Sequence, residues 1–398
     1  METQVQDMLK QRFAQEFGEV GERKLLYVRT PGRTEICGNH TDHEGGTVVA
    51  GAVDRHVHAL FSANGTSKVC VVSEGHGTIE VDLSQLEPVP EERNTSRALV
   101  RGVAACVAQR GYEVGGFDCV MTSEVPKGSG LSSSAAFEVE LAQAMNQLFA
   151  GGEIPREELA KIGQKAEREF FGKPCGLMDQ ASAALGSIQH MDFSVPSGLD
   201  AQAIPFDFAE HGYAVCLVAV GSSHEDLTDE YAAVPAEMQA VARKLGKEVL
   251  GQLDEQAVLD HIPELRAELG DRAVLRALHF FREDRLVAER AAALRAGDID
   301  AFLELERLSG ASSAMYLQNV AHGTLEQPAM VALALAEELL HDCGGAARIH
   351  GDGFGGTIQV FVPLERVEQF STGMDAAFGQ GACGVYAIDH EGTVAQWL

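Results

Sequence analysis

The chain has 398 residues, of which 45% are hydrophobic and 23% charged, as in an ordinary globular protein of two or three domains. Its formal net charge of −28 argues against nucleic acid and anionic membranes as partners, because both would repel it. No apolar run approaches the roughly 18 residues of a membrane helix, and we expect no signal peptide. The 8 cysteines include no Cys-x-x-Cys pair, so we expect reduced thiols and a cytoplasmic protein.

The first third of the chain predicts one helix followed by an antiparallel sheet. In residues 3–17, apolar side chains recur at helical spacing on one side. Strand-like apolar runs follow at 25–30, 47–61, 68–72, 78–82 and 117–122, and a helix-like run occupies 96–110. His56 and His58 fall on one face of the second strand, at a period of two, and we interpret both as structural side chains rather than ligands.

Residues 31–46, between the first two strands, are dense in polar side chains, and we expect a surface loop there. His40, Asp42 and His43 could form a metal site, but no further His or carboxylate at helical spacing completes it. Because Asp and His side chains exchange hydrogen bonds with hydroxyl groups, a site for a polar ligand is favoured.

Residues 125–136 read Val-Pro-Lys-Gly-Ser-Gly-Leu-Ser-Ser-Ser-Ala-Ala, and they join the strand at 117–122 to a helix-like run. Glycines allow a ligand to approach the backbone closely. The free N–H groups at a helix start, together with the helix dipole, can hold phosphate oxygens. The simpler alternative is a serine-capped helix. A Walker loop is excluded, because no Gly-Lys-Ser/Thr follows the glycines.

Two carboxylates stand out in the next segment. Pro155 opens a helix that ends at Gly172, and Glu167 lies beside its apolar stripe. This carboxylate is either an edge residue that reaches solvent or a group held inward for a cation. Asp179 follows a Pro/Gly turn and is either a helix N-cap or a catalytic group.

The remaining chain predicts a second unit. A polar, loop-like stretch at 196–205 marks a plausible domain boundary. A strand is expected at 213–220, helices over most of 230–342, and a closing helix and strand at 367–378 and 385–389. A second glycine-rich turn, Gly351 to Gly356, joins two short strands near the end.

Four of these segments, in this order, resemble motifs of the GHMP small-molecule kinases, and among them the galactokinases most closely. They are Gly32 to His43, Pro126 to Ala135, Ala166-Glu167 with Cys175 to Gln180, and Gly351 to Gly356. The resemblance runs from about residue 8 to the end. It implies an α+β fold of two lobes, in which mixed and antiparallel sheets pack with helices and the active site lies between the lobes. We expect an N-terminal lobe at 1–200 and a C-terminal lobe at 201–398.

The resemblance also implies roles for individual residues. Asp179 matches the aspartate that accepts the proton of the sugar's anomeric hydroxyl, and Arg33 matches the arginine beside it. Positions expected to contact the sugar are Asn39, His40, Asp42, Gly176 and Tyr231. Positions expected to bind ATP are Pro126, Gly128, Ser129, Gly130, Leu131, Ser132, Ser133, Ser134 and Ala135. Ser132 and Glu167 match positions associated with Mg²⁺, so ATP and Mg²⁺ are the implied cofactors.

The sequence departs from the galactokinase pattern around the sugar. Asn39 replaces a glutamate, His43 replaces a tyrosine, Leu317-Gln318-Asn319 replaces Leu-Arg-Asp, and Asp352 replaces a small residue. We therefore expect ATP-dependent phosphorylation of galactose, with a modified sugar such as galacturonate or an N-acetylhexosamine as the alternative substrate. A non-catalytic sugar sensor is the third reading, which the complete run from Ser132 to Ala136 disfavours. Nothing in the sequence indicates an oligomeric state.

Overall fold

The computed structural model describes residues 2–19, 21, 23–75, 77–126, 130–221, 228–321, 325–351, 353–354 and 356–398. Of the residues predicted to bind ATP, Gly128 and Ser129 lie outside the described residues. Asp352 and Gly355 of the second glycine turn lie outside them as well.

A large sheet organises the first half of the chain. Within the described residues it has eight strands, in the order β12-β1-β2-β5-β3-β4, with β6 and β7 attached beside β2. Its strands are β1 Leu26–Cys37, β2 Thr47–Ala63, β3 Lys68–Ser73, β4 Gly77–Asp82, β5 Phe117–Ser123, β6 Ile188–Asp192, β7 Asp200–Ile204 and β12 Val394–Trp397. The pair β3–β5 is parallel, whereas the other pairs are antiparallel, so the sheet is mixed.

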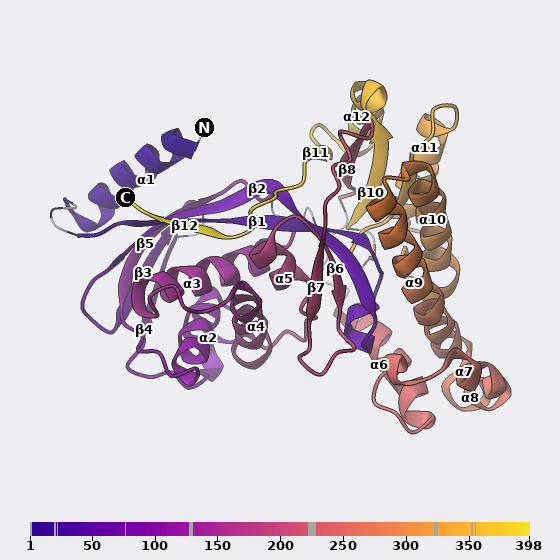
Figure 1. Cartoon of the computed structure of the whole chain (residues 1–398), viewed down its shortest axis with the longest axis horizontal. Coiled ribbons are helices and arrows are strands. Elements are labelled where there is room, and N and C mark those ends of the chain that lie inside the picture. Colours follow the sequence, from indigo (N-terminus) through magenta and orange to yellow (C-terminus); the bar gives the residue numbers. More distant parts are fainter. Residues whose placement is uncertain are drawn as a thin grey trace.

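Helices cover both faces of this sheet, because successive side chains of a strand point to opposite faces. Tyr27 and Leu60 pack under α1, Glu2–Phe17, whereas Val28 and Phe61 face the opposite core. That opposite face is covered by α2 Ser96–Gln109, α3 Ser133–Phe149, α4 Arg156–Ala166 and α5 Met178–Leu185. Figure 1 shows α1 alone on one side of the sheet and these four helices on the other.

The second half of the chain builds a smaller antiparallel sheet, in the order β11-β8-β10-β9. Its strands are β8 Tyr213–Ala219, β9 Ala346–Ile349, β10 Thr357–Pro363 and β11 Cys383–Tyr386. Its helices are α6 Thr228–Lys244, α7 Glu255–Asp260, α8 Ile262–Leu269, α9 Asp271–Ala296, α10 Ile299–Ser312, α11 Pro328–Leu340 and α12 Val367–Phe378. The long helices α9 and α10 pack on one face, and α11 and α12 on the other.

Short helical segments complete the described fold. Those of 3₁₀ type are Asp42–Glu44, Pro90–Glu92, Leu250–Gln252 and Leu364–Arg366, and those of π type are Glu167–Phe171 and Ser313–Leu317. Among the helices described, none is long and apolar enough to cross a lipid bilayer.

The observed elements confirm the predicted α+β class and correct the sequence interpretation at two places. Residues 31–37 are not a surface loop but the buried second half of β1, where register shifts in the pairing with β2 accommodate the polar side chains. Residues 196–205 include β7, which pairs with β6. We keep the division into two lobes near residue 200 as a proposal, with β12 returning to the sheet of the first lobe.

A buried ion-pair network joins α9 and α10 to β9 and β1. The guanidinium of Arg290 pairs with Glu283 and, at 2.6 Å, with Glu306. Glu306 also lies 2.8 Å from Arg348 Nε, and Arg348 Nη2 donates to the carbonyl of Glu35 at 2.8 Å. The four charged side chains that carry the ion pairs are fully buried. Because a buried charge is stable only when it is paired, this network fixes the second half of the chain to β1, the strand that carries Arg33.

Candidate active site

The centre of the candidate site is an ion pair between β1 and the first turn of α5. Arg33 donates from Nε to Asp179 Oδ1 at 2.6 Å and from Nη2 to Oδ2 at 2.7 Å. Ser132, at the start of α3, donates from Oγ to Asp179 Oδ2 at 2.5 Å. Arg33 Nη1 also donates to the carbonyl of Gly130. Three segments that are far apart in sequence therefore meet around one carboxylate. The kinase interpretation of the motifs predicts such a meeting.

The environment of Asp179 keeps it charged. Burial alone would raise the pKa of this carboxyl, but the charge and hydrogen bonds of Arg33, together with the hydrogen bond from Ser132, lower it below its ordinary value. The side chain of Asp179 is 29% exposed and that of Arg33 10% exposed. A ligand can therefore approach an ionised carboxylate from its open side.

The residue that precedes α3 does not act as a serine cap. Ser132 adopts a left-handed backbone conformation, with φ 54° and ψ 63°, and its side chain makes no capping hydrogen bond. Such a conformation is unfavourable for a residue with a Cβ and persists where the surroundings enforce it. Because the Ser132 hydroxyl is turned to Asp179, it leaves the first N–H groups of α3 to other acceptors. The serine-capped helix is therefore wrong, and the start of α3 is suited to an anion.

Two glycines permit the close approach of β1, the loop at residues 125–132 and the residue that follows β9. A Cβ on Gly32 would lie 2.9 Å from the carbonyl oxygen of Leu131. A Cβ on Gly130, whose φ is +77°, would lie 2.8 Å from His350 Nδ1. The side chains of Leu131 and Ala135 are buried, whereas Pro126, Gly130 and Ser133 are exposed and Ser134 is partly exposed. The loop thus presents mainly backbone and hydroxyl groups, which are the donors that phosphate requires.

His350 is a neighbour of this centre that the sequence did not reveal. It is 4% exposed, and its Nε2 accepts from the backbone N–H of Glu35 at 3.2 Å and contacts Thr34 Oγ1 at 3.0 Å. Burial, followed by the charges of Arg33 and Arg348, lowers the pKa of His350 well below its ordinary value. This histidine is therefore neutral and adds no charge beside Asp179.

Two buried glutamates lie behind Asp179. Gln180 Nε2 donates to Glu138 Oε2 at 2.9 Å and to Glu167 Oε2 at 3.0 Å, so the two carboxyl groups share one amide. Burial and the charge of Glu167 raise the pKa of Glu138 well above its ordinary value. Lys173 Nζ lies 3.7 Å from Glu167 Oε1. The sequence analysis predicted Glu167 and missed Glu138. A signal for Glu138 was present, because this charged residue stands on the same helix face as the apolar Ala135 and Ala142.

The oxygen groups of this cluster fit a hard divalent cation. Glu138 Oε1 is buried and has no hydrogen-bond partner, and Ser132 supplies a hydroxyl at the edge of the same region. Carboxylate and hydroxyl oxygens are the ligands that Mg²⁺ prefers. No direct contact joins Ser132 to Glu167 among the described interactions, so their shared role stays a prediction.

Asn39 is held by the second half of the chain. It is fully buried, and its Nδ2 donates to the carbonyl of Gly351 at 2.7 Å. Its Oδ1 accepts from Asn319 Nδ2 at 2.7 Å and from Ser313 Oγ at 3.3 Å. Two residues that depart from the galactokinase pattern, Asn39 and Asn319, are thus direct partners. A glutamate at position 39 would place a carboxylate against the Gly351 carbonyl, which two acceptors cannot tolerate.

The histidines of the same segment form a chain of contacts. His40 Nδ1 lies 2.9 Å from His43 Nε2, and His43 Nδ1 lies 3.2 Å from Glu44 Oε1. Glu44 is fully buried, and its Oε2 accepts from the N–H of Leu250 at 3.1 Å. A buried carboxylate therefore orients His43, and His43 orients His40.

Three further predicted sugar contacts lie at the same junction. An ideal Cβ on Gly176 would be 1.7 Å from Asp42 Oδ2, so the carboxylate occupies the space that any other side chain at 176 would need. Tyr231 donates from its hydroxyl to the carbonyl of Gly353 at 3.1 Å, and its ring packs edge-on against Phe354. Tyr231 thereby connects α6 to the second glycine turn.

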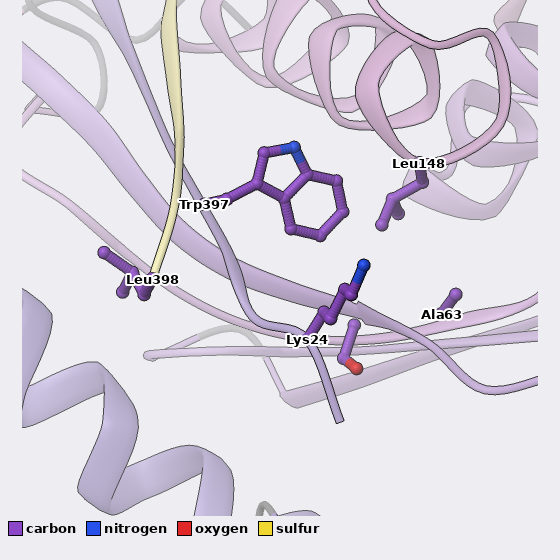
Figure 2. A pocket seen from close by; sticks show the side chains of 6 residues that line it. Lys24, Ala63, Leu148, Trp397 and Leu398 are labelled. Atoms are coloured by element: carbon purple, nitrogen blue, oxygen red, sulfur yellow. The ribbon is translucent and has the colours of Figure 1, made fainter. Parts of the chain in front are cut away.

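A surface pocket of about 720 Å³ lies in another region, between the last strand and the end of α3. It is lined by Lys24, Ser62, Ala63, Leu148, Trp397 and Leu398. Figure 2 shows the Trp397 indole over this hollow. None of these residues belongs to the four motifs, and we assign the chemistry to the Arg33–Asp179 centre because charged groups converge there.

Comparisons with known proteins point to one family. A family model for the N-terminal domain of GHMP kinases matches residues 98–187, and one for the galactokinase galactose-binding signature matches residues 11–63. The chain is 33% identical over 376 residues to a galactokinase of Mannheimia succiniciproducens, and the match covers 92% of each of the two chains. It is 32% identical over 371 residues to a galactokinase of Streptomyces coelicolor, which covers 91% of this chain and 92% of the relative.

Solved structures are similar as well. A Lactococcus lactis galactokinase complexed with galactose has a TM-score of 0.83 at 25% identity and covers 99% of this chain and 100% of its own. A mevalonate kinase, with a TM-score of 0.64 at 14% identity, covers 92% of this chain and 99% of its own and shares the fold alone. From its motifs, its fold and these relatives together, the chain belongs to the galactokinase family of the GHMP kinases.

Proposed function

We propose that the chain transfers the terminal phosphoryl group of ATP to the anomeric hydroxyl of galactose. The observation that carries this proposal is the convergence of Arg33, Ser132 and Asp179 on one partly open carboxylate. Phosphoryl transfer depends mainly on alignment of the two oxygens and on positive charge around the moving group. A strand arginine, a helix start and an ionised aspartate at one point meet these requirements.

Asp179 orients the sugar hydroxyl and accepts its proton on the exposed side of the carboxylate. Its lowered pKa makes it a weak base, which is adequate because a loose transition state needs little proton removal before the new bond forms. Arg33 holds Asp179 in place through two hydrogen bonds and supplies positive charge beside the transferring group.

The nucleotide phosphates bind at the start of α3, where backbone N–H groups and the helix dipole favour anions. The net charge of −28 repels ATP, so local cations must offset it. Ser132, Glu167 and Glu138 would hold Mg²⁺, which neutralises charge on the phosphate oxygens. Lys173, 3.7 Å from Glu167, adds a second positive group to this region.

A modified sugar is the second candidate substrate. Asn39 and Asn319 are neutral where the family pattern has acidic residues, and they are hydrogen-bonded to each other. These neutral amide side chains repel an anionic group, such as the carboxylate of galacturonate, less than a glutamate at position 39 would. We also propose a reducing compartment such as the cytoplasm, since all 8 cysteines are free thiols.

An ADP-release assay with a panel of sugars distinguishes these candidates. We expect turnover with galactose, and less with galacturonate or N-acetylgalactosamine. Turnover with galacturonate alone would replace the first substrate by the second. Sugar binding without ADP release from any sugar would identify a sensor and refute the kinase.

A further inference from the structure

A cluster of possible metal ligands lies on the sheet face that α1 covers, apart from the reaction centre. His56 and His58 belong to β2 and share one face because they are two residues apart. Glu124 follows directly after β5, and its backbone N–H donates to the carbonyl of His56 at 2.8 Å. The pairing of β2 with β5 therefore brings the three side chains together.

The spacing of their ligand atoms is close to that of a metal site. His58 Nε2 lies 3.4 Å from Glu124 Oε2, and His56 Nδ1 lies 3.8 Å from the same oxygen. One ligand atom from each residue lies within 4.8 Å of the others. Metal–ligand bonds of 2.0–2.1 Å in a tetrahedron separate the ligand atoms by about 3.3 Å. Small side-chain rotations would thus suffice to bring all three atoms to one ion.

The second nitrogen of each histidine already has a partner. His56 Nε2 lies 2.9 Å from Asp389 Oδ2, and His58 Nδ1 lies 2.7 Å from Tyr27 Oη. Metal-bound histidines in proteins nearly always have such a partner, which fixes the tautomer and the ring orientation. Arg29 Nη1 also approaches His56 Nε2 at 2.8 Å. An ion on His56 Nδ1 requires Arg29 to turn fully to Asp389, which it already contacts at 3.2 Å.

One nitrogen points into this cluster without a hydrogen bond. The side chain of His58 is 6% exposed, and its Nε2 is buried and has no hydrogen-bond partner. When His58 Nδ1 donates to Tyr27 Oη, the lone pair of the imidazole lies on Nε2, which faces Glu124. A buried polar atom without a hydrogen bond requires an explanation, and an ion bound between His58 and Glu124 would supply one.

The charges nearby favour a cation. Arg29 is close to three carboxylates, those of Glu2, Asp389 and Glu391, and Glu124 adds a fourth. Even with the positive charge of Arg29 included, the net charge of these side chains is negative.

We propose that His56 Nδ1, His58 Nε2 and Glu124 Oε2 form a binding site for a divalent transition metal ion such as Zn²⁺. Two imidazoles and one carboxylate suit Zn²⁺, whereas Mg²⁺ prefers oxygen ligands alone. Because Glu124 is 39% exposed, an ion can enter from its side, and water can take the fourth position. A bound ion would link β2 to the start of residues 125–136, the segment expected to bind the nucleotide phosphates.

The test is a Zn²⁺ titration of the full chain, without nucleotide, after removal of metals with a chelator. Isothermal titration calorimetry measures stoichiometry and affinity for the parent, Glu124→Ala, His56→Ala and the control His341→Ala. Glu124 is partly exposed and His341 is exposed, so these two variants are expected to fold. We expect one ion per chain in the parent, at least about tenfold weaker binding in both ligand variants, and no change in the control.

A second arm separates this site from the reaction centre. Zn²⁺ should raise the thermal unfolding midpoint of the parent and of Glu167→Gln, but not that of Glu124→Ala. Parent-like Zn²⁺ affinity in both Glu124→Ala and His56→Ala would overturn the proposal. Loss of binding in Glu167→Gln alone would also overturn it, because the ion would then belong to the kinase site.

Discussion

Replacement of Asp179 by asparagine tests the chemistry of the site with little change in shape. The carboxamide keeps the volume, but one of its two terminal groups is a donor. Of the three hydrogen bonds that Asp179 accepts from Arg33 and Ser132, at 2.6, 2.7 and 2.5 Å, at least one must be lost. The variant also cannot accept the hydroxyl proton. Loss of a positioned base costs about 10²–10⁴-fold in turnover, or about 3–5 kcal/mol of transition-state stabilisation.

Steady-state ADP release with saturating galactose and ATP measures this effect, and Asp300→Asn is the control, because Asp300 is exposed on α10. We expect ATP affinity, measured by calorimetry, to stay within a few-fold of the parent, since the substitution does not alter the backbone N–H groups at the start of α3. Turnover of Asp179→Asn within about tenfold of the parent, in folded protein, would refute the catalytic assignment.

Three further outcomes follow from the geometry. Arg290→Ala leaves the buried Glu283 without its cation and leaves Glu306 with Arg348 as its remaining partner. We therefore expect about 3–5 kcal/mol less stability in urea unfolding followed by circular dichroism, and a loss below about 1 kcal/mol contradicts the role of the network. Gly176→Ala places a carbon 1.7 Å from Asp42 Oδ2, so Asp42 must move. We expect the KM for sugar to rise at least about tenfold while the KM for ATP changes little. An unchanged KM for sugar would argue against Asp42 as a sugar contact. The pKa of Asp179 lies below its ordinary 3.8, so the stabilisation from its ion pair is present above about pH 4 and is lost as pH falls through the lowered pKa. For the same reason, we expect Asp179 to stay ionised, and the rate to show no acid limb from this group, above about pH 4. A pH–rate profile whose acid limb from this group lies near pH 6 would contradict that environment.

Most of the secondary structure could be predicted from the sequence, because hydrophobic periodicity is local. The 3.6-residue pattern of residues 3–17 matches α1, and the apolar run at 47–61 matches β2. The pattern fails at residues 31–37, where Arg33 and Glu35 stand in a buried strand. Their burial depends on partners from 179 and 348, which no local pattern can show.

The candidate site was predictable only through its motifs. Arg33, Ser132 and Asp179 meet as the resemblance implies, yet spacing alone could not bring together residues up to 146 positions apart. Ser132 illustrates the limit, because its sequence favours an N-cap whereas its left-handed backbone directs the hydroxyl to Asp179. The contact between Asn39 and Asn319, 280 positions apart, joins two departures that the sequence showed only as separate substitutions.

The central claim is that the Arg33–Asp179 centre directs phosphoryl transfer from ATP to one oxygen of the sugar. Phosphorus NMR of the product formed from galactose and ATP tests this claim directly. The account predicts a single sugar phosphate on the anomeric oxygen, together with one equivalent of ADP, and loss of that signal in Asp179→Asn. Phosphate on another hydroxyl, or ADP formed without any sugar phosphate, would contradict it.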